Sequence, residues 1–185
     1  MAKEHKLNTP LKSEELEKLK IGDTVLLSGT IYTARDAAHK RLIALVDEGK
    51  ELPFEIEGSV IYYVGPAPAK PGYPIGSAGP TTSYRMDPFT PKLLDIGLKA
   101  TVGKGPRSKE VIDSMVKNKA VYLAAVGGAA ALIARSIKEA KVIAYEDLKS
   151  EAIRELVVED FPCVVANDTT GSDLYKEGME KYKED

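Results

Sequence analysis

The stretch KATVGKGPRSKEVIDSMVKNKAVYLAAVG, residues 99–127, carries the pattern that decides the fold class. A short β-branched run, KATVG, is followed by a polar turn, KGPRS, and then by SKEVIDSMVKN, whose apolar residues recur at helical spacing. The strongly apolar run AVYLAAVG ends the stretch and predicts a buried strand. Strand, helix and strand in this order are typical of an α/β protein.

The segments before this stretch predict further strands and helices. Residues 25–32 are β-branched and apolar, which predicts a strand with a candidate bulge at Gly29. The strand is expected to end at Arg35. Asp36 is expected to cap a helix that stops at Gly49, where a glycine permits the left-handed C-terminal conformation.

A long connection rich in proline and glycine lies in the middle of the chain. It is PAPAKPGYPIGSAGPTTSYRMD, residues 66–87, and it follows the predicted strand SVIYYVG at residues 59–65. Unstructured connections longer than ~12–15 residues are uncommon in compact domains and often functional. This loop ends in a cluster of hydroxyls and an arginine, before a helix expected between Asp87 and Gly97. It is therefore a candidate functional segment.

The C-terminal third predicts two more helices and a last strand. Residues 127–140, GGAAALIARSIKEA, are expected to form a helix packed through its small residues. Residues 152–161 are expected to form a helix, residues 162–168 a strand, and residues 177–185 a solvated tail. We therefore expect an α/β fold with one mixed sheet covered by helices, in a single domain that spans residues 1–185.

Composition excludes several functional classes. The chain has 26 basic and 28 acidic residues and a net charge of −2, so it presents no broad positive field for nucleic acid. No run approaches the ~20 apolar residues of a membrane span, and the charged N-terminus lacks the apolar core of a signal peptide. We therefore expect a cytoplasmic protein. Cys163 is the single cysteine, so it cannot by itself hold zinc or an iron-sulfur cluster, and it is assigned no role.

Three predicted turns carry side chains suited to an anion. They contain Arg35 with Asp36 and His39, the stretch TTSYR at residues 81–85, and Lys104 between two glycines. Two guanidinium groups and an ammonium from separate loops would suit a substrate with two carboxylates. Threonine and serine hydroxyls also commonly satisfy loop backbone groups, and a histidine near a cap commonly lies on a helix face. The residues alone therefore indicate an anion site and not a reaction.

The segment GPTTSYRMD, residues 79–87, resembles the signature of the β region of iron-sulfur fumarases and L-tartrate dehydratases. Residues 27–41 resemble the arginine-bearing strand and turn of that family, VGKG resembles its lysine loop, and YLAAVGGAAALIA resembles its Gly/Ala segment. The matching segments stand in the family's order and cover roughly residues 8–178. The resemblance implies a swivelling β/β/α domain that docks against a larger partner.

The resemblance also implies roles for individual residues. Arg35, Arg85 and Lys104 would bind the substrate carboxylates, and Thr81 would be the catalytic base. A threonine hydroxyl is a poor base, so nearby cations would have to favour its alkoxide form. The [4Fe-4S] cluster would be ligated by a partner α subunit, a separate polypeptide, and its iron would act as a Lewis acid. This chain would bind no metal, and the isolated chain would form a homodimer through its empty partner surface.

The expected activity is reversible hydration of a small dicarboxylate. The first expectation is the β subunit of a fumarate hydratase, which interconverts fumarate and (S)-malate. The alternatives are the β subunit of an L(+)-tartrate dehydratase and a dicarboxylate-binding module without a reaction. A partner subunit with three suitably placed cysteines would exclude the last of these. The grip on two carboxylates would serve both enzymes, so the sequence leaves the substrate open.

Overall fold

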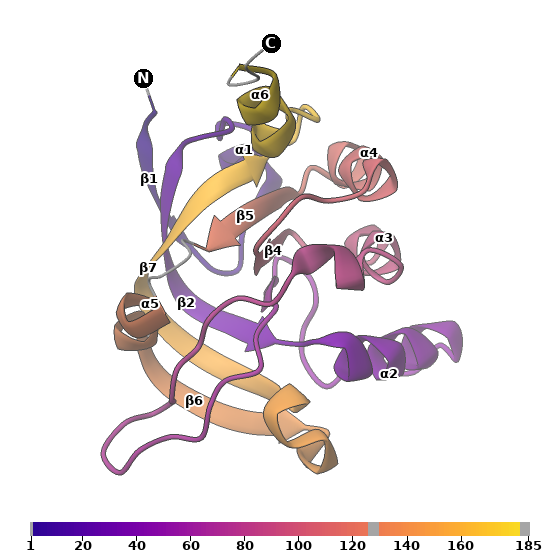
Figure 1. The fold of residues 1–185 in the computed structure, drawn as a ribbon. Helices are drawn as coiled ribbons and strands as arrows, with labels where there is room; N and C mark the ends of the chain where they lie inside the picture. Colours follow the sequence, from indigo (N-terminus) through magenta and orange to yellow (C-terminus); the bar gives the residue numbers. More distant parts are fainter. Residues whose placement is uncertain (1, 126–129, 182–185) are drawn as a thin grey trace.

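A computed structural model describes residues 2–125 and 130–181, whose seven strands form one mixed sheet (Figure 1). The order in the sheet is β1-β2-β3-β4-β5-β7-β6. The strands are β1 Glu4–Asn8, β2 Thr24–Thr33, β3 Val60–Tyr62, β4 Ala100–Gly103, β5 Val121–Ala125, β6 Ile137–Ala144 and β7 Ile153–Asn167. Strands β1 to β5 run parallel to one another, whereas β7 runs antiparallel to β2, β5 and β6.

Strand β7 converts the sheet into a barrel. It pairs with β2 along one edge and with β5 along the other, so that β2, β3, β4, β5 and β7 close on themselves. Closure satisfies the backbone groups that two sheet edges would otherwise expose. The residues that point into the barrel are apolar and buried, and they include Val25, Leu27, Val102, Leu123, Leu156 and Val165.

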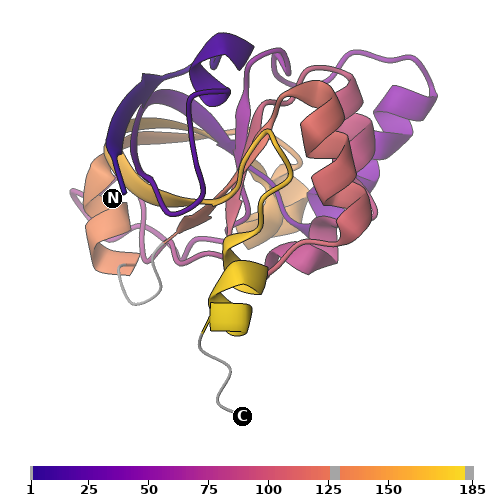
Figure 2. The same ribbon diagram turned by 90° about the horizontal axis from the view of Figure 1, so that it is seen from above.

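Helices α2, α3 and α4 lie along one side of the sheet (Figures 1 and 2). The α-helices are α1 Ser13–Leu16, α2 Asp36–Asp47, α3 Thr90–Asp95, α4 Lys109–Asn118, α5 Ala130–Ser136 and α6 Leu174–Lys181, with short 3₁₀ helices at η1 Ser83–Met86 and η2 Glu146–Glu151. A second core fills the space between these helices and the sheet, where Leu42, Leu93 and Met115 pack with Tyr63 and Tyr122. None of the helices in the described ranges is long and apolar enough to cross a membrane.

The predicted α/β fold, with a mixed sheet and covering helices, is confirmed. The strand predicted at residues 25–32 is the centre of β2, and its pairing with β7 shifts register between Leu27 and Gly29. Gly29 has a φ of +106°, and a Cβ there would collide with Thr9, so this position requires glycine. The register shift lies at the predicted position, but the extra residue is in β7, where Glu159 and Asp160 stand opposite Ser28 alone.

The helix predicted at residues 152–161 is wrong, because this segment is the first part of β7. The prediction at residues 127–140 is only partly right: α5 ends at Ser136 and residues 137–140 are the start of β6, while residues 126–129 lie outside the described part. Both segments contain β-branched residues and pair with each other, so the sheet supplies their hydrogen bonds. Of the segment expected to be a solvated tail, residues 177–181 are the end of α6, and residues 182–185 lie outside the described part.

Two helix starts also differ from the prediction. Arg35, not Asp36, occupies the cap position of α2, and Asp36 is the first helical residue, where a carboxylate is favourable in the first turn. Helix α3 begins at Thr90, three residues after Asp87, because a turn follows η1. These shifts leave the side chains of the first turn of α2 at the end of β2.

Candidate functional site

The candidate residues lie at the carboxyl ends of three neighbouring parallel strands. Arg35 follows the end of β2, and Lys104 directly follows β4. The loop that leaves β3 returns to the same edge, where the backbone N–H of Thr81 donates to the carbonyl of Tyr63 at 2.7 Å. Carboxyl ends of parallel strands meet at one edge of a sheet, which is where α/β proteins commonly bind ligands. The fold therefore brings the three predicted turns to one edge.

Arg35 and Arg85 are joined through the carboxylate of Asp36. The Nε of Arg85 donates to Oδ1 of Asp36 at 3.0 Å, and Nη2 of Arg35 lies 3.8 Å from Oδ2 of the same residue. Arg35 also lies 3.2 Å, through Nε, from Oε1 of Glu151 in η2. A Cβ on Gly65 would lie 2.9 Å from Nη1 of Arg35, so the guanidinium packs directly against the backbone of that glycine.

Thr81 and Lys104 are joined through their backbones. Lys104 N–H donates to the Thr81 carbonyl at 3.3 Å, and Ser83 N–H donates to the Lys104 carbonyl at 2.9 Å. Thr82 and Lys104 consequently form a short parallel bridge. The Lys104 side chain is exposed and the Thr81 side chain is half-buried.

The structure therefore forms two pairs of candidates, Arg35 with Arg85 and Thr81 with Lys104. The 3₁₀ helix η1 links the pairs, because Arg85 lies only four positions after Thr81. The contacts within residues 2–125 and 130–181 place the backbone of Lys104, but none of them fixes its side chain relative to either arginine. That all three cations line one pocket stays a prediction.

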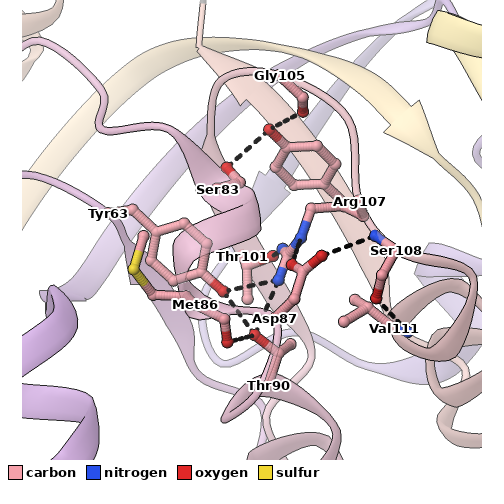
Figure 3. Close-up of polar contacts among 11 residues, drawn as sticks. Tyr63, Ser83, Met86, Asp87, Thr90, Thr101, Gly105, Arg107, Ser108 and Val111 are labelled. Carbon is pink, nitrogen blue, oxygen red and sulfur yellow. Dashed lines mark hydrogen bonds and ion pairs between the residues drawn. The ribbon is translucent and has the colours of Figure 1, made fainter.

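Arg107 is a buried cation that the sequence did not reveal. Its side chain is fully buried, and Nε donates to Asp87 at 2.6 Å while Nη1 donates to Thr101 at 2.9 Å (Figure 3). Nη2 donates to Thr90 at 2.8 Å and to the Tyr63 hydroxyl at 3.3 Å. In sequence, this residue is an arginine of a polar turn, and no local signal distinguishes it from an exposed one.

The Arg107–Asp87 pair connects the two loops that carry the candidate residues. Asp87 ends the TTSYRMD segment, and its second oxygen accepts the backbone N–H of Ser108 at 2.7 Å. The guanidinium carbon also lies 5.0 Å from the ring centroid of Tyr122, within range of a cation–π contact. The loop after β3 is thus fixed to the loop after β4.

The Tyr122 hydroxyl forms a second connection between these loops. It donates to the Gly105 carbonyl at 2.9 Å and lies 2.8 Å from Oγ of Ser83. Because its single proton goes to the carbonyl, Ser83 must be the donor in the other bond. Burial raises the pKa of Tyr122, so the hydroxyl keeps its proton. A Cβ on Gly103 would occupy the place of the Ser83 hydroxyl, which explains a glycine at the end of β4.

His39 is fully buried on the inner side of α2. Its Nδ1 lies 2.8 Å from the carbonyl oxygen of Arg35, so the neutral ring carries its proton on Nδ1. The pKa of His39 is lowered to about 4, chiefly by burial; Arg107 also lowers it, whereas the bond to the Arg35 carbonyl and Asp36 act in the opposite direction. His39 thus holds the backbone of Arg35 as an uncharged group, not as an acid or base.

The residues present do not fit an iron-sulfur cluster. Cys163 is the single thiol of the chain and is buried in the barrel, where desolvation raises its pKa. The part of the chain that the structure describes holds no group of three or more His, Cys, Asp or Glu side chains able to bind a metal ion.

The chain is similar to known fumarate hydratases and tartrate dehydratase subunits. Residues 1–178 match the family model described as Fumarase C-terminus. The chain is 41% identical over 179 residues to "Fumarate hydratase class I, anaerobic" of Escherichia coli, covering 95% of this chain and 33% of the relative. It thus spans about a third of the fumarate hydratase's length.

Two relatives match over nearly their whole length. A "Putative L(+)-tartrate dehydratase subunit beta" of Methanocaldococcus jannaschii is 39% identical, with 94% of this chain and 92% of the relative covered. The "L(+)-tartrate dehydratase subunit beta" of Escherichia coli is 33% identical, with 96% and 90% covered.

Replacing Arg107 should strongly destabilise the fold. Arg107→Met leaves the carboxylate of Asp87 buried without its cation, which should cost about 3–5 kcal/mol of unfolding free energy. Urea denaturation followed by circular dichroism measures this. The control is Arg41→Met, which removes an exposed ion pair with Asp147 and should lower the unfolding free energy far less, because water and salt screen exposed pairs. Equal losses in the two variants would show that the buried pair has no special structural role.

Stability should fall as the pH decreases from about 6.5 to about 4, because of His39. The folded-state pKa is below the unfolded value, so the unfolded chain binds the extra proton in this window and gains stability from it. The loss should reach about 3 kcal/mol near the acid end. Asn can place an amide N–H near Nδ1, so His39→Asn should flatten this part of the curve. Identical pH profiles of unfolding free energy in the two proteins would contradict the assignment.

Proposed function

Since the chain belongs to the Fumarase C-terminus family, that of class I fumarate hydratases and tartrate dehydratase β subunits, we propose that it is the β subunit of such a hydro-lyase. Fumarate and (S)-malate are the first proposed substrate pair, supported by the 41% identity to a class I fumarate hydratase. Tartrate and oxaloacetate are the second, supported by alignment over 92% and 90% of two tartrate dehydratase β subunits.

One observation carries this proposal. The loops that bear Arg35, Thr81, Arg85 and Lys104 meet at the carboxyl ends of adjacent parallel strands. A guanidinium offers two parallel donors to a carboxylate, whereas an ammonium supplies a compact point charge. Cations on three neighbouring loops suit a dianion whose two ends need separate partners, because a buried carboxylate without a cation is costly.

In the proposed reaction, this chain holds the substrate and moves one proton. Arg35, Arg85 and Lys104 bind the carboxylates and orient the carbon-bound proton toward Oγ1 of Thr81. That oxygen takes the proton in the direction of dehydration. Thr81 is half-buried, and desolvation alone disfavours an alkoxide, so the cations of the neighbouring loops would have to favour the charged form of its hydroxyl.

The proposed partner is an α subunit that supplies the iron-sulfur cluster and the general acid. The relatives named as β subunits support it, since such a name implies a second subunit. The [4Fe-4S] cluster of this iron-sulfur hydro-lyase family would polarise the substrate hydroxyl when bound to that subunit. A dicarboxylate-binding module without a reaction is the alternative if no such subunit exists.

The first test is reconstitution under anaerobic conditions. The chain mixed with its cluster-bearing subunit should hydrate fumarate or dehydrate L(+)-tartrate, because each half supplies groups that the other lacks. The chain alone should show no turnover, and steady-state assays with both substrates decide between them. Turnover by the chain alone, or none with the cluster-loaded pair on either substrate, would refute the proposal.

The second test concerns Thr81. In the reconstituted enzyme, Thr81→Ala should lower kcat by ~100-fold or more and change KM little, because a base acts in the transition state more than in binding. Thr82→Ala is the matched control, since it removes an adjacent hydroxyl of the same loop, and its effect should be milder. Equal small effects would instead make both hydroxyls part of the loop structure.

A further inference from the structure

The carboxylate of Asp36 lies between the two candidate arginines. One oxygen accepts from Nε of Arg85 at 3.0 Å, and the other lies 3.8 Å from Nη2 of Arg35. The arginines are 50 positions apart in the chain, and Asp36 is the carboxylate that both approach. Two guanidinium groups at one site repel each other, so a shared anion stabilises their proximity.

The contact with Arg85 leaves most of its hydrogen-bonding capacity free. Arg85 uses only Nε toward Asp36, and its side chain is 44% exposed. Within the described ranges, neither terminal nitrogen of Arg85 has a hydrogen-bond partner. A guanidinium held at Nε can still offer its two terminal N–H groups to one carboxylate. Asp36 thus fixes the plane of the Arg85 guanidinium and leaves its two terminal nitrogens free to bind a carboxylate.

The surroundings of Arg35 are incompletely satisfied. Nε of Arg35, Oδ2 of Asp36 and Nε2 of His39 are buried atoms without a hydrogen-bond partner in the residues described, and all three lie in or next to the first turn of α2. Glu151 lies near Nε of Arg35, but the alignment is not that of a hydrogen bond. Buried polar atoms usually have partners. Nε of Arg35 is the one donor among the three and can still bind a carboxylate, whereas Oδ2 of Asp36 and the unprotonated Nε2 of His39 are acceptors that a carboxylate does not satisfy.

Asp36 itself is held in place from both sides. It is the first residue of α2, where the helix dipole favours a carboxylate, and its neighbour Arg35 is fixed through the His39 bond to its carbonyl. Its side chain is only 27% exposed. A carboxylate with this little freedom can set the orientation of the side chains that contact it.

We infer that Asp36 is a positioning residue that holds Arg35 and Arg85 in the orientation that receives the substrate carboxylates. This inference rests on the proposed function, because it assigns a dicarboxylate to the two arginines. Asp36 acts through the arginines and does not touch the substrate. The opposite role, a placeholder that the substrate must displace, predicts a change of opposite sign when the charge is removed.

The test is Asp36→Asn, which keeps the size and one acceptor oxygen but removes the charge. With the reconstituted enzyme, KM should rise about 10-fold while kcat changes little, because misplaced arginines weaken binding before chemistry. With the chain alone, NMR titration with succinate, an unreactive dicarboxylate, should show about 10-fold weaker binding. Asp36→Glu should restore part of the loss, since its carboxylate can still reach an arginine.

The matched control is Asp147→Asn, which neutralises an aspartate that pairs with Arg41, also of α2, but away from the strand ends. Its KM and succinate affinity should equal those of the wild type. Thermal unfolding verifies that each variant is folded. If Asp36→Asn does not fold, Asp36→Glu is compared with the wild type in its place.

The outcomes separate this inference from the proposed function. A lower KM or tighter succinate binding in Asp36→Asn would show a placeholder, and values equal to the control would show no role; either overturns the inference. If the wild-type pair is inactive on both substrates but succinate binding still depends on Asp36, the proposed function fails and the positioning role stands. Absence of both activity and succinate binding in the wild type would overturn both.

Discussion

The simultaneous pairing of β7 with β2 and β5 is the constraint on which the rest of the structure depends. This strand supplies backbone partners to two edges that are otherwise three strands apart, so the sheet closes and its apolar face becomes the barrel interior. Closure also fixes β2, β3 and β4 as parallel neighbours with their carboxyl ends level. The loops that follow these ends have no alternative but to share one edge of the molecule.

Within that edge, buried polar contacts decide how the loops lie. Arg107 has no exposed side-chain surface, and it distributes its donors among residues of the β3 and β4 connections. Removing such a buried cation would leave its carboxylate without a partner. The Arg107–Asp87 pair therefore holds the loop of Thr81 to that of Lys104 more firmly than an exposed ion pair could. The Tyr122 hydroxyl adds a directed chain of hydrogen bonds between the same loops. The candidate site is therefore rigid at its base and exposed at its tips.

The charge balance of the site suits a binding half that needs a partner. Arg35, Arg85 and Lys104 contribute three positive charges, but Asp36 and Glu151 offset two of them. A dianion would meet directed hydrogen-bond donors here but only a small net positive charge. Its binding would therefore depend more on oriented hydrogen bonds than on long-range electrostatic attraction. In the proposed function, the cluster-bearing subunit would polarise the substrate hydroxyl.

The sequence by itself determined the α/β class, the strand that contains Gly29, and the turns that carry Arg35, Thr81, Arg85 and Lys104. Those features follow from local signals: apolar periodicity, glycine and proline positions, and hydroxyls beside an arginine. The resemblance to the family was also readable from short segments in order. Only the tertiary structure decided that residues 152–161 are strand, that Arg107 is buried, and that Asp36 lies between two arginines. Strand pairing, desolvation and shared counter-ions depend on neighbours that are remote in sequence, so no local pattern encodes them.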